Sequence, residues 1–386
     1  MGNFPRLIIF ITMLLNGCVD PYHIKSVGYQ GSLVVEGFIS TDLVQHQVKL
    51  SRTAPINKPQ FIAETGAQVN IKSGSGSIPL TEASPGIYLT PPLQGVVGNV
   101  YTLYITTQNG QQFQSGAVTL KDTPDIKNIY ALYSSSVAPL SNSPGIQIFL
   151  DTDDSTHQAQ YYRWEFIETW EIQTPFESEF EWLGGNNVVL RSIPVSTCYA
   201  TDTSSNILIQ STHGLTNDKI TAQVIQTLSA DAQAMRIRYS ILVKQFTLTE
   251  SSYQYWQTLK NINEGQGTLY DIQPGTVVGN ITSSNSGETA LGYFDAGAVK
   301  AKRAFFRPSN FIASGYTPPD FESYCNFFTP IKIPVSQIGT FYNDPANLNF
   351  EITGATGFGD ATLFLIPKVC CDCTSLGTNV KPSFWP

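Results

Sequence analysis

Short runs of alternating apolar and polar residues fill the first third of the chain. Residues 32–40 and 99–107 both alternate, and the pair Asn109-Gly110 follows the second run. A period of two residues is typical of a strand with one buried face, and Asn-Gly is a strong signal for a tight hairpin. We therefore predict at least six strands within residues 31–122, arranged as an immunoglobulin-like or transthyretin-like β-sandwich.

The remaining residues, 123–386, predict a second, larger β-rich domain. Its longest alternating run is 161–176, and a second long apolar run covers 236–248. One amphipathic helix is expected near residues 250–263, with Thr249 as its cap, because apolar residues there recur at helical spacing. The fold class is therefore mostly β, in two domains with one helix and a cysteine-rich tail.

The start of the chain has the layout of a lipoprotein signal. Arg6 precedes an apolar run over residues 7–15, and Gly17-Cys18 follows it. The run is too short to cross a bilayer as a helix, which needs about 20 residues. We predict that residues 1–17 are removed, that Cys18 is lipidated, and that residues 18–30 are a tether. The body would then be exported and held at the outer membrane, facing the cell surface.

Composition narrows the range of partners. The chain of 386 residues is 41% hydrophobic, which is enough for packed cores, and only 13% charged. The formal net charge is −8, and no run of basic residues is present. Binding to nucleic acid or to an anionic lipid surface through charge is therefore disfavoured. Attachment to the membrane would depend on the lipid of Cys18.

Five cysteines remain once Cys18 is set aside, so at most two disulfides can form, which would leave one free thiol. They are Cys198, Cys325, Cys370, Cys371 and Cys373. Export permits disulfides, and adjacent Cys370 and Cys371 are poorly placed to bridge each other. We expect Cys198 and Cys325 to pair with the tail cluster or with each other, because spacing does not determine connectivity.

The chain shows no catalytic or cofactor motif. It has no Gly-x-Ser-x-Gly elbow, and its four histidines are scattered. The tail cysteines fit disulfides better than a zinc site. The acidic run 151–154 lacks the glycine and the acidic residue of a calcium loop, so it is interpreted as a solvated acidic turn. We therefore predict a protein that is not an enzyme and that holds no metal and no cofactor.

Contact residues for a partner or ligand are sought in the segment 174–187, which is expected to be an exposed loop. Its aromatic residues are Phe176, Phe180 and Trp182. Aromatic side chains often anchor interfaces, so these three are the contact candidates. Glu165, Glu168 and Glu171 are interpreted as part of the solvent-exposed, wet face of the strand 161–176, with Trp164 and Trp170 on its buried face.

Several motifs occur in an order that resembles a known family. They are Leu33-Val34-Val35-Glu36-Gly37, Gly279-Asn280-Ile281, Leu291-Gly292-Tyr293-Phe294 and Cys370-Cys371-Asp372-Cys373. This order resembles the Bacteroidota lipoprotein family catalogued as domain of unknown function forty-two forty-nine. Members of that family look like outer-membrane lipoproteins encoded beside TonB-dependent transporters. The resemblance implies a transporter accessory or lid role and supplies no binding residues.

Two functional hypotheses follow. The first is a lipid-anchored accessory protein that docks on a TonB-dependent outer-membrane β-barrel transporter and helps capture or gate its substrate. The alternative is a free-standing surface adhesin or glycan-binding lipoprotein, which the predicted sandwich and the loop aromatics favour. A hydrolase is a weaker third hypothesis, and it would require two carboxylates that converge in a pocket.

Overall fold

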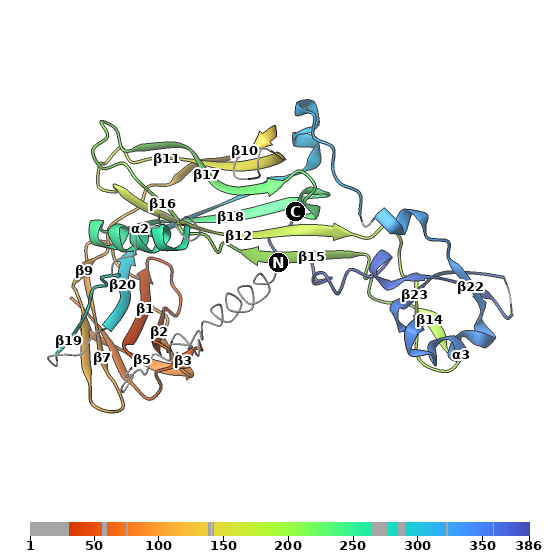
Figure 1. The fold of residues 1–386 in the computed structure, drawn as a ribbon, viewed down its shortest axis with the longest axis horizontal. Coiled ribbons are helices and arrows are strands. Elements are labelled where there is room, and N and C mark those ends of the chain that lie inside the picture. The colour runs from red at the N-terminus through yellow and green to blue at the C-terminus, as the bar shows by residue number, and fades with distance from the viewer. Residues whose placement is uncertain are drawn as a thin grey trace, which may run out of the picture.

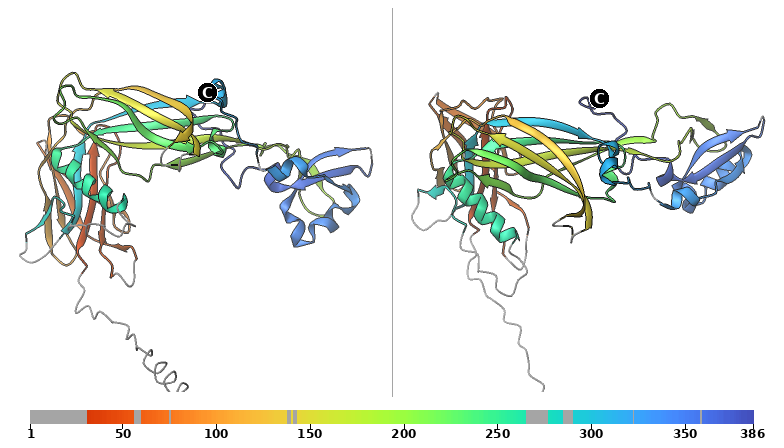
Figure 2. Two further views of the ribbon diagram at one scale, coloured as in Figure 1. Left: turned by 45° about the horizontal axis from the view of Figure 1, so that its top comes forward. Right: turned by 90° about the horizontal axis from the view of Figure 1, so that it is seen from above.

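The computed structural model describes residues 31–55, 60–74, 76–137, 140, 143–264, 277–284, 290–321, 323–357 and 359–386. In that part of the chain the fold is mostly β, as predicted, with two α-helices. Three packed units follow one another (Figure 1): a first sandwich, a central sandwich and a distal lobe. The strands of the first sandwich run across the direction of the central strands, and the distal lobe lies at the far end (Figure 2).

The first sandwich contains eleven strands, nine of which follow one continuous path. They are β1 (Leu33–Ser40), β2 (Gln47–Arg52), β3 (Ile62–Ala63), β4 (Gln68–Ser73), β5 (Gly76–Ser84), β6 (Ile87–Leu89), β7 (Val100–Thr106), β8 (Gln112–Ser115), β9 (Val118–Thr119), β19 (Ile281–Ser283) and β20 (Ala290–Gly297). The path bends at β5, which pairs with β4 through its first half and with β6 through its second. Both halves of the path therefore face one apolar core, which includes Leu33, Leu50, Ile71 and Leu103.

The two ends of this path meet. β20 lies parallel to β1 over its whole length, from Leu33 opposite Ala290 to Ser40 opposite Gly297. β19 lies at the other end of the path, and the Asn280 side chain before it bonds to Phe294 of β20. The Asn280 amide accepts from the Phe294 main-chain nitrogen at 2.9 Å and donates to the Phe294 oxygen at 2.7 Å. The side chain thus replaces a strand partner and closes the sandwich.

Two glycines allow this close approach. Gly292 has φ +95°, and a Cβ there would lie 1.9 Å from the Val35 main-chain oxygen. A Cβ on Gly279 would lie 1.8 Å from the main-chain oxygen of Gly292. Any side chain at either position would collide with main chain that has no room to move.

The membership of β19 and β20 differs from the predicted division of the chain. The sequence assigned everything after residue 122 to the second domain, whereas residues 281–297 pair with the strands of residues 31–122. Alternation identifies a strand but not its partner, and the partner here is hundreds of residues away. The chain therefore leaves the first sandwich, builds most of the central one, and returns.

The central sandwich stacks two sheets. The smaller sheet contains β10 (Ile126–Val137), β11 (Ser143–Asp153) and β17 (Lys219–Ser229), and the larger contains β12 (Tyr161–Gln173), β15 (Thr197–Thr203), β16 (Leu208–Ser211), β18 (Tyr239–Thr247) and β21 (Val299–Phe306). The predicted parity of β12 is confirmed, because Tyr162, Trp164 and Phe166 are buried in the core between the sheets. The interpretation of Glu168 as part of the wet face is wrong: its side chain lies on the buried face and accepts a hydrogen bond from Tyr239.

Helix α2 (Glu250–Glu264) fills the corner between the two sandwiches (Figure 1). The predicted cap is confirmed: Thr249 Oγ1 accepts from the Ser252 main-chain nitrogen at 3.2 Å. The Ser252 hydroxyl in turn donates to the buried carboxylate of Asp295 in β20. Burial, opposed by this bond and by the nearby Arg163, raises the pKa of Asp295 to about 6.

The distal lobe has its own small sheet and core. Its elements are β13 (Phe180–Trp182), β14 (Val188–Leu190), β22 (Ile331–Pro334), β23 (Phe350–Thr356), β24 (Thr362–Pro367) and helix α3 (Ile338–Tyr342). Ile338, Ile352 and Leu365 are central to its core. Short 3₁₀ turns also occur, one before β18 in the central sandwich and six in the later part of the chain. They are η1 (Gln233–Met235), η2 (Pro308–Asn310), η3 (Ile312–Ser314), η4 (Ser323–Phe327), η5 (Val335–Gln337), η6 (Pro345–Asn349) and η7 (Lys368–Cys370).

Gly292→Ala should destabilise the first sandwich strongly. The new Cβ would overlap the Val35 oxygen, so β1 and β20 must separate, and we expect a loss of roughly 3 kcal/mol or more in the free energy of unfolding. Gly98→Ala is the matched control, because Gly98 also has positive φ but open space around its Cβ position. That control should lose only about 1 kcal/mol. Equal losses in urea unfolding would contradict the role of the close approach.

Asp295→Asn should change how stability depends on pH. The unfolded carboxyl has its ordinary pKa of about 4, whereas the folded one titrates near 6. The folded state therefore binds the proton more tightly, and the wild type loses stability as pH rises from about 4 to about 6. Relative to wild type, the variant should gain on the order of 2 kcal/mol between those limits. Asp125→Asn, at an exposed carboxylate, is the control. A difference that stays constant with pH would refute this assignment.

Candidate functional site

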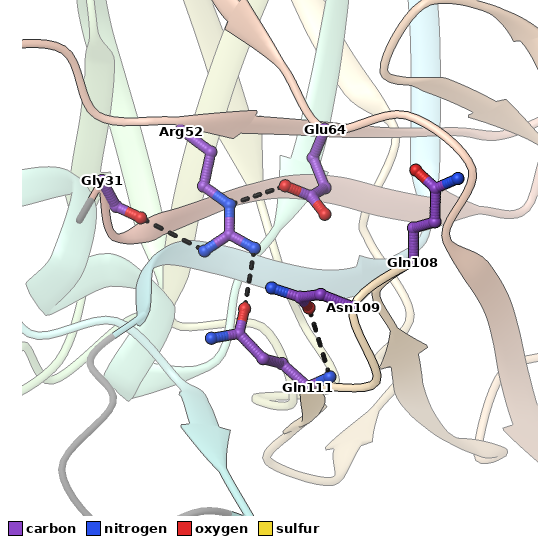
Figure 3. Close-up of a pocket in the computed structure, with 6 residues that line it drawn as sticks. All are labelled: Gly31, Arg52, Glu64, Gln108, Asn109 and Gln111. Carbon is purple, nitrogen blue, oxygen red and sulfur yellow. Dashed lines mark hydrogen bonds and ion pairs between the residues drawn. The ribbon is translucent and has the colours of Figure 1, made fainter.

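A wide hollow opens at the end of the first sandwich where the described chain begins. Its volume is about 670 Å³, and its walls are polar: Gly31, Arg52, Glu64, Gln108, Asn109 and Gln111. We call it the Arg52 hollow (Figure 3). Gly31 precedes β1, Arg52 ends β2, and the amide residues come from the turn between β7 and β8. Glu64 follows β3, so four segments build the site at one end of the sheet.

Arg52 organises this hollow. Its Nε donates to Glu64 Oε2 at 2.6 Å, its Nη1 to the Gly31 oxygen at 3.1 Å, and its Nη2 to Gln111 Oε1 at 2.9 Å. These three bonds radiate from one guanidinium group in Figure 3. The Arg52 and Glu64 side chains are only 18% and 14% exposed, so the ion pair is shielded more than a surface pair. The bond to Gly31 fixes the point where the preceding chain emerges.

The turn that carries the amides follows from local sequence. Gly110 has φ +87°, which is the conformation that the predicted Asn109-Gly110 hairpin needs, and β7 pairs with β8 on either side. The Thr107 hydroxyl donates to Asn109 Oδ1 at 2.5 Å, and the Thr107 main-chain nitrogen donates to the Gln111 oxygen at 2.9 Å. The turn is thus held rigid while the Gln108 and Asn109 side chains stay exposed.

The chemistry of the Arg52 hollow is that of polar recognition. Arg52 and Glu64 neutralise each other, and Arg52 uses both sides of its guanidinium group on the protein itself. The groups that face outward are amides, which donate and accept hydrogen bonds without charge. Such a surface suits hydroxyl groups, amides or the main chain of another protein. Among the described residues, no group of three or more histidine, cysteine or carboxylate side chains is placed to hold a metal ion.

Comparison with known protein families assigns the chain to one of them. A family model described as Domain of unknown function (DUF4249) matches residues 19–303, which is most of the chain. The chain belongs to this family. A search of curated proteins finds no match. The DUF4249 region covers the first sandwich, including the Arg52 hollow, and nearly all of the central sandwich, but only β13 and β14 of the distal lobe.

The predicted anchor lies outside the described residues. This applies to the signal segment 1–17, to Cys18 and to the tether 18–30. Among the helices that the structure describes, none has the length and apolar character needed to cross a membrane. The DUF4249 region begins at residue 19, directly after Cys18.

The cysteine expectations are met in one of the ways left open. Cys198 of β15 pairs with Cys373, and Cys325 pairs with Cys370. Cys371 is the free thiol, buried beside both bridges, and burial raises its pKa to about 12. The bridges attach the tail to the central sheet and to η4. They support the junction with the distal lobe and lie away from the Arg52 hollow.

The aromatic contact candidates do not lie on a free loop. Phe180 and Trp182 form β13, and the Trp182 ring stacks on Tyr342 of α3 with centroids 4.7 Å apart. Phe176 packs against the cysteine cluster. All three side chains are half-buried, because two of them pack on the core of the distal lobe and the third on its junction. Segment 174–187 therefore serves the folding of the distal lobe.

Two carboxylates of the acidic run 151–154 accept hydrogen bonds from the protein itself. Asp154 is 4% exposed and accepts hydrogen bonds from Thr156, Gln158 and Ala159 main-chain nitrogens. Asp151 accepts from the main-chain nitrogen of Ala222 at 2.8 Å. Asp151 and Asp153 belong to the end of β11, and Asp154 shapes the turn that follows. The prediction of a solvated acidic turn is therefore wrong for Asp154, whose carboxylate is buried.

Sequence reasoning did not identify Arg52 or Glu64 as site residues. Arg52 is the last residue of the alternating run 47–52, and Glu64 stands in a segment without periodicity. The one usable signal was the Asn109-Gly110 turn, which fixes where Gln111 stands. The contact between β2, β3 and this turn arises only from the folding of the sheet.

Arg52→Gln should loosen the hollow and its exit point. The Glu64 carboxylate would remain largely buried without its cation, and the Gly31 oxygen would lose its donor, so we expect a loss of about 2 kcal/mol in the free energy of unfolding. Lys49→Gln is the matched control, because Lys49 and Glu36 form a more exposed pair on the same sheet. That control should change stability by less than about 1 kcal/mol. Equal midpoints in urea for the two variants would contradict the prediction.

Proposed function

We propose that this protein is a lipid-anchored outer-membrane accessory that docks on a TonB-dependent β-barrel transporter and helps capture or gate its substrate. The observation that carries the proposal is the position of the Arg52 hollow at the end of the first sandwich from which the chain leads toward Cys18. A hollow beside the exit of a short tether stays near the membrane and near any barrel embedded in it. The protein acts by binding in this proposal, without catalysis.

The length of the tether limits how far the Arg52 hollow can lie from the membrane. Residues 19–30 separate Cys18 from Gly31, and even a fully extended chain of that length spans only about 40 Å. Because Arg52 holds the Gly31 oxygen, the hollow and the exit point move together. The amide side chains of Gln108 and Asn109 then face a region that the extracellular loops of a barrel would occupy, and amides suit the main chain of such loops.

A pull-down tests the docking directly. The full chain with a C-terminal tag is purified in mild detergent from its native membrane, and co-purifying proteins are identified by mass spectrometry. We expect a stoichiometric β-barrel transporter. Gln108→Arg places a bulky cation in the hollow and should reduce recovery of the barrel, whereas Gln210→Arg, at an exposed position of β16, should not. A lone lipoprotein in the eluate, with and without cross-linking, would refute the proposal.

The second candidate function is a free-standing adhesin or glycan-binding lipoprotein. The observation that favours it is the same polar lining, since amide side chains pair well with sugar hydroxyl groups. Retention of the isolated protein on a glycan array, lost in Gln108→Arg, would support this function when no barrel co-purifies.

A further inference from the structure

The arginines of this protein divide into two groups. Of the seven in the described residues, three form ion pairs with glutamates, namely Arg52 with Glu64, Arg163 with Glu165, and Arg191 with Glu351. The other four are Arg236, Arg238, Arg303 and Arg307. Within the part of the chain that the structure describes, none of these four has a side-chain carboxylate within 4.0 Å. All four lie on or beside β18 and β21.

Strand register brings two of these cations together. Tyr239 of β18 pairs with Phe306 of β21, so Arg238 and Arg307 occupy adjacent positions just beyond the end of this ladder. Like charges side by side repel each other, which costs stability unless an anion lies between them. Because the whole chain carries a net charge of −8, such a pair stands out as a local reversal of the overall charge.

A second hollow lies at this pair, and we call it the Arg307 hollow. Its volume is about 360 Å³, which is the size range of small-ligand pockets. The lining includes Arg238, Arg307 and Lys381 as cations and Glu171 as the single carboxylate side chain, with Tyr199 and Trp385 as aromatic walls. Pro386, the last residue, adds a main-chain carboxylate to the lining, so three cations face two carboxylates and the hollow stays positive by one charge.

The groups already in contact leave room for a ligand. Arg238 Nη1 and Lys381 Nζ each donate to the main-chain oxygen of Pro386 at 3.1 Å, which uses one donor of several on each side chain. Arg307 uses its main chain to bond with Asn310. Glu171 Oε2 accepts from Trp385 Nε1 at 3.3 Å, which fixes this carboxylate at the wall and leaves its other oxygen as an acceptor.

We propose that the Arg307 hollow binds a hydroxylated carboxylate, the chemistry of a sugar acid, through the paired guanidinium groups of Arg238 and Arg307. Guanidinium groups match a carboxylate with two parallel hydrogen bonds. Glu171 accepts from a ligand hydroxyl group, and Lys381 donates to one. The concave shape and small volume fit a single sugar unit better than the surface of an acidic protein. This inference is independent of the transporter partnership, because the hollow lies in the central sandwich, away from the Arg52 hollow.

Calorimetric titration of the purified full chain in detergent, at low ionic strength, tests the proposal. The probes are glucuronate, glucose and acetate. We expect glucuronate to bind at least tenfold more tightly than glucose, which lacks the carboxylate, and than acetate, which lacks the hydroxyl groups. Its affinity should fall with added salt. Equal binding of acetate and glucuronate would reduce the hollow to a simple anion site and overturn the assignment to sugar acids.

Substitutions locate the binding. Arg307→Gln should weaken glucuronate at least tenfold, and Lys381→Gln should weaken it by a smaller factor; both side chains are exposed, so the fold should persist. Lys219→Gln is the control, since it removes one exposed cation of the central sandwich outside the hollow. Glucuronate affinity unchanged in both hollow variants, or lowered equally in the control, would refute the proposal. Because no partner is present, failure here leaves the pull-down result unaffected.

Discussion

The parallel pairing of β1 with β20 is the constraint on which the rest of the structure depends. It requires the main chain of β20 to approach Val35 so closely that only glycine fits at position 292. It also requires Asn280 to complete the sheet from the opposite end. With that contact made, α2 and β21, which flank β20 in sequence, must lie at the corner. The direction of the central sandwich relative to the first is therefore set by a main-chain contact rather than by a flexible linker.

Strand β1 runs from the Arg52 hollow at one end of the first sandwich to the central sandwich at the other. At its start, Gly31 is held by Arg52 beside the polar hollow. Just past its end, the Thr41 hydroxyl accepts from the main-chain nitrogen of Val299 in β21, at the entrance of the central sandwich. A force or displacement at the tether exit would thus pass along one eight-residue strand to the corner. The buried Asp295 and α2 lie at that corner, where the Ser252 hydroxyl of α2 bonds to the Asp295 carboxylate.

Local patterns predicted local structure well. The buried face of β12, the Asn109-Gly110 hairpin and the capped helix after Thr249 all depend on neighbouring residues, and all three are confirmed. The partner of β20 was beyond reach because a parallel pair carries no turn signal. The aromatic residues Phe180 and Trp182 show the same limit: composition marked them as contacts, but their partner Tyr342 lies in a distant segment. Arg52 was missed for this reason too, since its three acceptors come from separate parts of the chain.

The net charge of the chain likewise does not predict where the folded protein could bind a small anion. A chain with net charge −8 argues against binding polyanions along an extended surface. Charge counting does not exclude a single anionic group, because one anion needs only two or three cations at one place. The ladder between β18 and β21 gathers Arg238 and Arg307 from segments far apart in sequence. Aromatic walls and one fixed glutamate around them limit the volume to a small molecule. A strand register can therefore create a selective anion site in an acidic protein without leaving any trace in its composition.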